Sequence, residues 1–497
     1  MHDPALTCEI AVVGAGFSGI GAGIRLKQAG FHDFAIFEQA GDLGGTWRDN
    51  TYPGIAVDIT SFTYSFSFEP NPDWSRVFAP GHELKAYADH CADKYGVRGH
   101  IRFHTRIVRA VFDSDAGVWR LHSGDNEVIV ARYLISACGG LTQPKVPDIA
   151  GLGSFAGKVV HTARWDHAHD LSGRRVAIIG TGATSVQLTP AIAPLVERLF
   201  VFQRTPIWIL SKPDAEIPAA LRTLFRYLPL TQTSVRAATS LLTEIIMTFG
   251  IVYNRQLPWL VRGLERICLN HLNAQVRDAE LRRKLTPSYG FGCKRPSFSK
   301  DYFPAFNRAN VELVTDRIDR MTPGGIRTVD GRERTVDTLI LATGFKVFEK
   351  GNTPPFEVYG RGGIELGDFW DRHRYQAYEG ATVPGFPNAF MVLGPYATTG
   401  SSWFSMVEAQ TTHAVRCLSE ARRRGARVIE IRQEPHDAFF QDILRRQKNT
   451  VFFNNNCARA NSYYFDRHGD APFLRPASGA ELWWRCRTFD LDHYQFS

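Results

Sequence analysis

The sequence predicts an α/β protein that contains two similar strand–turn–helix units and a helical insertion. The first observation is a glycine motif that occurs twice, as GAGFSG at 14–19 and as GTGATS at 180–185, each directly after an apolar run. The second is a stretch at 211–316 in which basic and apolar residues alternate without strand-like runs. A strand, a glycine turn and a helix repeated in this way indicate two Rossmann-like dinucleotide-binding domains.

Each unit carries a polar residue that predicts its ligand. Glu38 ends an apolar run twenty-four residues after Gly14, and Arg204 ends one at the same distance from Gly180. A carboxylate at this place accepts a hydrogen bond from a ribose 2′-hydroxyl, whereas an arginine suits a 2′-phosphate. We therefore expect the chain to bind two dinucleotides, the first like FAD and the second like NADPH.

The small residues of the two motifs have separate physical roles. The first makes the turn, the second lets the backbone approach the pyrophosphate, and the third lets helix and strand pack closely. One such motif is often only a turn before a buried helix, but two copies at equal spacing disfavour that interpretation. The residues predicted to contact cofactors from these turns are Gly14, Gly16, Ser18, Gly19, Gly180, Thr181, Gly182 and Ser185.

A chain of 497 residues is too long for one compact core and implies two or three domains. Apolar runs at 338–345 and 389–393 read as strands that complete sheets begun much earlier. We therefore expect both nucleotide domains to be discontinuous. The predicted division is an FAD domain at 1–142 with 381–497, an NADP domain at 143–210 with 317–380, and the insertion at 211–316.

Composition narrows the class of protein. The net charge of +8 is mild for this length and suits anionic cofactors, and no basic block is long enough to predict nucleic-acid binding. Thirty-four phenylalanines hint at a roomy apolar site. Nothing in the sequence predicts an oligomeric state.

The eight cysteines argue against a metal site and against a disulfide reductase. No two of them lie within five residues of each other, so no metal-binding or redox spacing is present. This usage suits a reducing cytoplasm, and the first strand begins within ten residues of the start, which leaves no room for a signal peptide. We expect a cytoplasmic protein.

The segment 237–254 is apolar, and Glu244 is its only formally charged residue. Its interspersed Thr, Ser and Gly residues make it an unconvincing membrane span. We expect a helix that packs over a substrate pocket; the alternative is a contact that lies on a membrane surface.

The segment FAGKVVHTARWD at 155–166 resembles the FxGxxxHxxxW[P/D] fingerprint of type I Baeyer–Villiger monooxygenases. The resemblance spans nearly the whole chain and includes DLGGTW at 42–47, GCKRP at 292–296 and ATGF at 342–345. It implies an enzyme that uses FAD, NADPH and molecular oxygen to convert an apolar ketone into an ester or lactone through a C4a-peroxyflavin, with sulfide oxidation as a side activity.

Two alternatives remain open. One is a flavin monooxygenase restricted to nitrogen or sulfur, in which Tyr or Phe usually stands where this chain has Trp165. The other is a flavoprotein that only consumes NADPH or serves as a binding module. His161 of the fingerprint has no visible partner, so we expect it to be part of a structural hinge rather than a catalytic group.

The resemblance also assigns site residues. It makes Arg295 the fixed cation of the oxygenation site, with Asp58 beside it to hold the guanidinium. A surface Lys-Arg pair and a capping aspartate are the ordinary alternatives for these residues. Lys294 would join Arg204 and Thr205 around the 2′-phosphate. Further cofactor contacts are predicted at Thr46, Trp47, Tyr64, Val111 and Gly394.

The sequence departs from the family pattern near its C-terminus. Related enzymes often carry Ser-Trp-Tyr in the active-site loop, where this chain reads NSYY at 461–464. Tyr463 could still reach cofactor or substrate, and the rest of the 454–476 loop has no assigned role. The identity of the ketone and the stereochemistry are therefore the least predictable properties.

Overall fold

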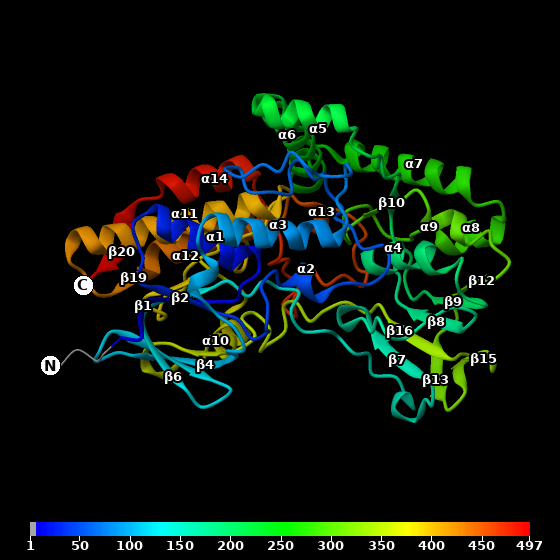
Figure 1. Ribbon diagram of the computed structural model, residues 1–497, viewed down its shortest axis with the longest axis horizontal. Coiled ribbons are helices and arrows are strands. Elements are labelled where there is room, and N and C mark those ends of the chain that lie inside the picture. Colours follow the sequence, from blue (N-terminus) through cyan, green and yellow to red (C-terminus); the bar gives the residue numbers. More distant parts are fainter. Residues whose placement is uncertain (1–5) are drawn as a thin grey trace.

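The computed structural model describes residues 6–497 and contains two large sheets, each covered by helices (Figure 1). The first sheet has the strand order β17-β4-β5-β6-β1-β2-β3, with β18 paired to β6. β1 is nearly completely buried, and it pairs in parallel with both β2 and β6. The strands are β1 (Cys8–Val13), β2 (Phe34–Phe37), β3 (Ile101–Arg102), β4 (Ile107–Asp113), β5 (Val118–Ser123), β6 (Val128–Ser136), β17 (Glu357–Tyr359) and β18 (Ala389–Met391).

Helices from both ends of the chain cover this sheet. α1 (Phe17–Gln28) packs against α11 (Trp403–Arg424), and α11 in turn packs against α14 (Gly479–Thr488). The C-terminal part therefore returns to the first domain, as predicted. The other helices of this region are α2 (Thr46–Asp49), α3 (Gly81–Lys94), α10 (Leu366–His373), α12 (Gln433–Gln447) and α13 (Val451–Asn454), and β19 (Ile429–Ile431) pairs with β20 (Tyr494–Phe496).

The second sheet is parallel throughout, with the order β12-β9-β8-β16-β7. Its strands are β7 (Lys158–His161), β8 (Arg175–Ile179), β9 (Arg198–Phe202), β12 (Val311–Val314) and β16 (Thr338–Leu341). α4 (Ala183–Ile192) follows β8 as the helix of the second glycine motif, and α9 (Tyr302–Ala305) contacts it. Short strands lie beside this sheet at β10 (Ile209–Leu210), β11 (Ser297–Phe298), β13 (Ile318–Thr322), β14 (Gly325–Thr328) and β15 (Glu333–Thr335).

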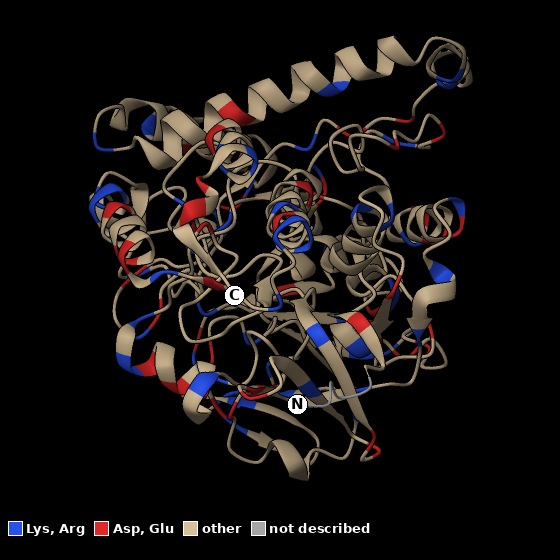
Figure 2. Ribbon diagram, turned by 90° about the vertical axis from the view of Figure 1, so that its left-hand side faces the viewer, with Lys and Arg blue, Asp and Glu red and all other residues tan. Residues whose placement is uncertain are grey.

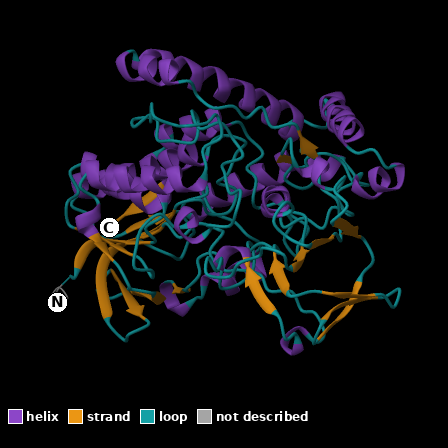
Figure 3. Cartoon of the chain, turned by 45° about the vertical axis from the view of Figure 1, so that its right-hand side comes forward, coloured by secondary structure: helices purple, strands orange, loops and turns teal. Residues whose placement is uncertain are grey.

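The insertion consists of helices along one edge of the molecule, above the two groups of strands (Figure 3). They are α5 (Ala219–Tyr227), α6 (Pro229–Ile245), α7 (Pro258–Gln275) and α8 (Ala279–Leu285), and a π-helical stretch (Ile246–Val252) extends α6. By length and composition alone, 229–252 could cross a membrane. Only part of it packs on the protein, since Thr248, Ile251 and Val252 are buried while Leu241 and Leu242 are exposed. The expected packing helix is therefore largely open to solvent.

Two strands fall outside the predicted domain boundaries. β12 belongs to the second sheet although 311–314 lay within the predicted insertion. β17 pairs with β4 of the first sheet although 357–359 lay in the predicted NADP domain. Both strands are only three or four residues long, so the sequence contains no extended apolar run that would predict them. Their hydrogen bonds to the edge of a sheet determine which domain they belong to.

A buried ion triad fixes the C-terminal part to the first domain. The Glu379 side chain is fully buried and accepts hydrogen bonds from Arg475 Nη2 and Arg485 Nε, each at 2.6 Å. Arg475 is itself only 1% exposed. The buried Arg475 loses its counter-charge if Glu379 is removed, whereas Arg485 is 38% exposed.

Candidate active site

A cavity of about 530 Å³ opens at the carboxyl ends of β1, β2 and β6, where parallel sheets of this kind bind nucleotides. Seven of the predicted FAD contacts line it: Gly14, Gly16, Ser18, Glu38, Thr46, Trp47 and Tyr64. The indole of Trp47 donates to the Tyr64 hydroxyl at 3.1 Å, which fixes both side chains at the cavity wall. Phe17 and Trp403 also line the cavity and were not predicted.

The first glycine motif has the geometry that its sequence predicts. Gly14 has φ +102°, and a side chain there would meet the carbonyl oxygen of Ala137 at 2.9 Å. A side chain at Gly19 would overlap the carbonyl oxygen of Gly14. The third small residue therefore serves close packing of helix and strand, and in the second motif the fully buried Ser185 takes its place.

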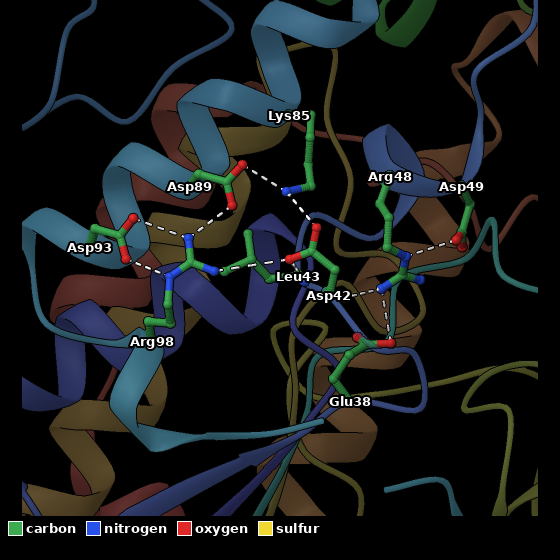
Figure 4. Close-up of polar contacts among 9 residues, drawn as sticks. All are labelled: Glu38, Asp42, Leu43, Arg48, Asp49, Lys85, Asp89, Asp93 and Arg98. Carbon is green, nitrogen blue, oxygen red and sulfur yellow. Dashed lines mark hydrogen bonds and ion pairs between the residues drawn. The ribbon is translucent and has the colours of Figure 1, made fainter. Parts of the chain in front are cut away.

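Glu38 is held ready to accept a hydrogen bond. It is 5% exposed, its two carboxylate oxygens accept from the amides of Ala15 at 2.9 Å and Ala40 at 3.0 Å, and it lies 3.1 Å from Arg48 Nη1. Figure 4 shows Arg48 between Glu38 and Asp49. A carboxylate has about four acceptor sites, so one remains for a ribose hydroxyl.

A second network seen in Figure 4 secures the loop that carries Thr46 and Trp47. Lys85 of α3 bridges Asp42 at 2.8 Å and Asp89 at 2.7 Å, and Arg98 extends the network to Asp89 and Asp93. The exposed pairs contribute little stability individually. Together they fix the direction in which the loop leaves the sheet.

Three predicted FAD contacts do not line this cavity, and one of them is Gly19, which packs against the carbonyl group of Gly14. Val111 does not line the cavity; it sits in the middle of β4, and Ile107 at the start of that strand lines the cavity instead. Four residues along a strand correspond to about 13 Å, which explains the displacement. Gly394 lies in a small adjoining cavity that shares Cys138 and Trp403 with the large one.

The second glycine motif has a free helix start. Gly182 caps α4 without a side-chain hydrogen bond, so the first amides of this helix are available for a pyrophosphate. Gly180 has φ +113°, and a side chain there would lie 2.4 Å from the carbonyl oxygen of Ala342. The Thr181 hydroxyl donates to the carbonyl oxygen of Thr205 at 2.8 Å, which ties the predicted phosphate loop to the turn.

Lys294 and Arg204 lie close enough to interact, and in the described part of the chain neither forms an ion pair. Burial, and secondly the charge of Arg204, lowers the pKa of Lys294 to about 8. Two neighbouring cations without a counter-charge favour an anion between them. This arrangement fits the 2′-phosphate of NADPH.

The pH dependence of NADPH binding tests this site. We expect the KM for NADPH to rise several-fold between pH 7 and pH 9, because Lys294 loses its proton as the pH passes its pKa of about 8. Lys294→Met should show a raised KM already at pH 7 and little further change. Initial rates with NADH, which lacks the 2′-phosphate, provide the control; the same pH dependence with NADH would contradict the assignment.

Asp58 and Arg295 form the ion pair that the resemblance implies. Arg295 donates from Nε to Asp58 Oδ2 at 3.0 Å and from Nη2 to Oδ1 at 2.8 Å, a bidentate geometry that fixes the plane of the guanidinium. The Asp58 charge is the main cause that raises the pKa of Arg295 above its usual value. Tyr64 of the FAD cavity interacts electrostatically with both residues, so the pair lies beside that cavity.

A side chain of the second domain holds the segment before Asp58. Gln187 of α4 accepts from the Tyr52 hydroxyl at 2.9 Å and donates to the carbonyl oxygen of Ala56 at 2.8 Å. Gln187 was not predicted, because nothing near it in the sequence indicates a contact 131 residues away. It links the Asp58 segment to the helix of the second glycine motif.

A family model described as flavin-binding monooxygenase-like matches residues 7–241. A Baeyer–Villiger monooxygenase of Pseudomonas aeruginosa is 39% identical over 99% of this chain and 92% of that protein. The chain belongs to the Baeyer–Villiger monooxygenases. One from Streptomyces coelicolor is 38% identical over 98% of this chain and 92% of its own length. These relatives confirm the resemblance found in the sequence.

Solved structures of Baeyer–Villiger monooxygenases and related enzymes have the same fold. OTEMO in complex with FAD and NADP aligns with a TM-score of 0.86 at 26% identity, over 99% of this chain and 100% of that one. Cyclohexanone monooxygenase from Rhodococcus sp. Phi1 bound to NADP+ aligns with a TM-score of 0.85 at 26% identity, over 99% of both chains. They confirm the predicted α/β fold with two dinucleotide-binding domains.

The Baeyer–Villiger fingerprint begins within the second domain, where Lys158–His161 form β7 at the edge of the second sheet. His161 Nδ1 accepts a hydrogen bond from the Ala163 amide at 3.1 Å, and burial lowers the pKa of His161, so the neutral ring is favoured. Phe155 is buried in one hydrophobic cluster of the second domain, and Trp165 packs against another. These contacts agree with the expected structural hinge.

The C-terminal loop of this Baeyer–Villiger monooxygenase reaches the ion pair. Tyr463 and Tyr464 lie near enough to Arg295 to affect its pKa. The same region corrects the expectation of reduced cysteines, since Cys293 forms a disulfide with Cys457. The two lie 164 residues apart, and only the fold brings them together. The other six cysteines are free, and the described residues contain no group of ligands that could hold a metal ion.

Proposed function

We propose that this Baeyer–Villiger monooxygenase uses NADPH, FAD and molecular oxygen to insert one oxygen atom into apolar ketones, which gives esters or lactones. The observation that carries the proposal is the position of Arg295. It follows Lys294 of the predicted NADPH site, pairs with Asp58 and lies beside Tyr64 of the FAD cavity. One cation thus stands where the two nucleotide sites meet.

The residues of both sites fit the two cofactors. The close backbone at Gly14 and the oriented Glu38 suit the pyrophosphate and ribose of FAD, and the open start of α4 with Lys294 and Arg204 suits NADPH. FAD, once reduced by NADPH, supplies the activation of oxygen.

Arg295 supplies a fixed positive charge to the reaction. Negative charge develops on the carbonyl oxygen of a ketone when an oxygen nucleophile attacks it, and a preoriented guanidinium stabilises that charge. Arginine remains protonated where a lysine could lose its proton. Asp58 orients the guanidinium and leaves its outer edge free for the substrate.

A second candidate function is oxygenation of nitrogen or sulfur alone. Trp165 of the fingerprint disfavours it. The test is to supply a cyclic ketone or an aryl methyl sulfide with NADPH and identify the products by gas chromatography–mass spectrometry. We expect a lactone from the ketone and a sulfoxide from the sulfide; a sulfoxide without any lactone would favour the second candidate.

We also propose that the enzyme acts in the cytoplasm. Six free cysteines suit a reducing compartment. The one disulfide is buried, with Cys293 at 0% and Cys457 at 6% exposure, which limits access of small thiols.

A further inference from the structure

The Cys293–Cys457 disulfide joins two loops that both reach the active site. Cys293 precedes Arg295 by two residues, and Cys457 precedes Tyr463 by six. Tyr463 and Tyr464 lie near enough to Arg295 to affect its pKa. The cross-link therefore joins the segment that carries the cation to the start of the C-terminal loop.

Other contacts place the same two loops against each other. A side chain at Gly290 would overlap the side-chain amide of Asn455, so this side chain packs directly on the Gly290 backbone. Asn456 Nδ2 donates to the carbonyl oxygen of Ser288 at 3.5 Å, which is a weak bond. The weakness of these polar contacts leaves the disulfide as the strongest tie between residues 288–293 and 455–457.

The far end of the C-terminal loop has its own anchor. The Tyr464 ring is 9% exposed and stacks on Phe473, and it meets Phe452 edge-on. These packing contacts hold the ring but do not reach Arg295. The neighbouring Phe465 packs against the cluster that contains Tyr289, Phe291 and the disulfide, so the cross-link is the covalent part of the contact that sets the loop relative to Arg295.

We propose that the Cys293–Cys457 disulfide is a positioning element for the oxygenation reaction: it holds Tyr463 and Tyr464 against Arg295 and thereby closes the site around the ketone. The inference rests on the proposed role of Arg295. A site whose loop has loosened admits water and binds ketone less tightly, while transfer of hydride from NADPH to flavin needs neither loop contact. Without the cross-link, we therefore expect more NADPH to be oxidised for each molecule of ester formed.

The cross-link can be removed by simple thiol–disulfide exchange. Dithiothreitol reduces the disulfide to two protein thiols and leaves as its cyclic disulfide, so two electrons and two protons pass from reagent to protein. The bond is surrounded by Trp208, Tyr289 and Phe291, which makes this exchange slow in the folded enzyme. Serine variants avoid that obstacle.

The test compares Cys457→Ser and Cys293→Ser with Cys268→Ser. Cys268 belongs to the same buried cluster but is a free thiol, so its variant reports ordinary damage to packing. In the two disulfide variants we expect the KM for ketone to rise several-fold and the ester formed per NADPH to fall at least twofold. The anaerobic rate of flavin reduction at saturating NADPH should remain unchanged in Cys457→Ser, whose residue lies away from Lys294 in the sequence, and Cys268→Ser should match the wild type. Wild-type enzyme incubated with dithiothreitol should approach the disulfide variants, which should themselves not respond.

Unchanged coupling and KM in both disulfide variants would overturn the inference. Equal losses of coupling and ketone affinity in Cys268→Ser would also overturn the inference, because they would show that disturbed core packing causes the effect. Peptide mapping of wild-type enzyme under non-reducing conditions must find the 293–457 cross-link; two free thiols would also contradict the proposal. A wild-type enzyme that makes no ester would instead contradict the proposed function.

A second inference concerns an exposed apolar surface of the insertion, formed by α5, α6 and the start of α7. Its side chains include Tyr227, Leu228, Leu230, Leu241, Leu242 and Trp259, each at least 57% exposed. Figure 2 shows α6 as the long helix at the top of the molecule with very few charged residues. A large exposed apolar surface of this kind indicates a site that contacts a membrane or another protein.

The exposed charged residues within 219–267 are all arginines, one of which, Arg226, pairs with Asp73. Residues 219–267 contain six arginines and two glutamates, and no lysine or aspartate. Both glutamates face the protein: Glu244 accepts from Ser401 and from the Gly479 amide, and Glu265 accepts from the Phe291 amide. Arg255, Arg262 and Arg266 are exposed. Exposed apolar side chains can enter the acyl boundary of a bilayer, and exposed arginines near them can bind anionic lipid headgroups.

The helix is fastened to the protein along its length. Arg236 donates to the carbonyl oxygens of Phe62 and Ser65, and Glu244 is held as described above. Spanning a bilayer would break these contacts. We infer that the α5–α6–α7 surface lies on an anionic lipid surface, from which apolar ketones enter the enzyme.

Co-sedimentation with vesicles tests this second inference. We expect the full-length enzyme to sediment with phosphatidylcholine vesicles that contain phosphatidylglycerol and to bind at least fivefold less to pure phosphatidylcholine. A variant with Leu230, Leu241 and Leu242 changed to Glu should lose binding. A control with Glu at Leu195, which is 54% exposed beside the second sheet, should retain it. Absence of vesicle binding, or a dimer in analytical ultracentrifugation that only the triple variant abolishes, would overturn the inference.

Discussion

Replacing Arg295 by alanine is expected to reduce ester formation from ketone by at least about 10²–10³-fold, the usual effect of removing a group that stabilises an oxyanion. The guanidinium is held in one orientation by two hydrogen bonds to Asp58, so the substitution removes a preoriented positive charge. Reduction of the flavin by NADPH should continue, because Lys294 and Arg204 still bind the nucleotide. Ester yield and NADPH consumption, measured in the same reaction, separate the two steps.

Arg277→Ala is the matched control for that experiment. Arg277 is an exposed arginine of the insertion whose side chain forms no hydrogen bond or ion pair with the described residues. We expect its variant to form ester at the wild-type rate. Arg295→Lys should recover little activity, because an ammonium group does not reproduce the bidentate contact with Asp58. Near wild-type ester formation by Arg295→Ala would refute the catalytic assignment.

Replacing Glu379 by alanine should have the largest effect on stability. The variant leaves Arg475, 1% exposed, without its counter-charge, and breaking a buried pair in this way costs about 3–5 kcal/mol. Burial alone would raise the pKa of Glu379, but Arg475 and Arg485 outweigh it and hold that pKa below the ordinary value. The contribution is thus present at neutral pH and is lost as the pH falls through the lowered pKa.

Urea unfolding at pH 7 measures this effect, with Glu420→Ala as the control. Glu420 also binds two arginines, Arg423 and Arg424, but these partners are 70% and 36% exposed, so its removal leaves no buried charge behind. Removing such surface pairs changes stability little. Equal loss in the two variants would show that the Glu379 triad has no special role.

Local sequence patterns predicted the parts of the fold that depend on local physics. The two glycine motifs determine a turn, a helix start and a polar strand end within 24 residues, so the positions of Gly14 and Gly180 in turns and of Glu38 and Arg204 after strands follow from the sequence alone. Their cofactor contacts stay predictions. The Asp58–Arg295 pair spans 237 residues, and only the resemblance to a family connected its members.

Contacts that depend on tertiary structure were missed for the same reason. The disulfide joins residues 164 apart, and Gln187 binds a segment 131 residues away. Val111 was predicted as a cofactor contact from β4, but the residue of that strand that lines the cavity is Ile107, at its start. Short strands such as β17 gave no apolar signal of their own.

The most direct test of ketone oxygenation is a reaction under ¹⁸O₂. The purified enzyme with FAD and NADPH receives a cyclic ketone, and the product is analysed by mass spectrometry. We predict a lactone that contains one ¹⁸O atom in the ring, with the carbonyl oxygen still that of the ketone. A lactone without the label, or NADPH consumption that yields only reduced oxygen species with every ketone supplied, would contradict the account.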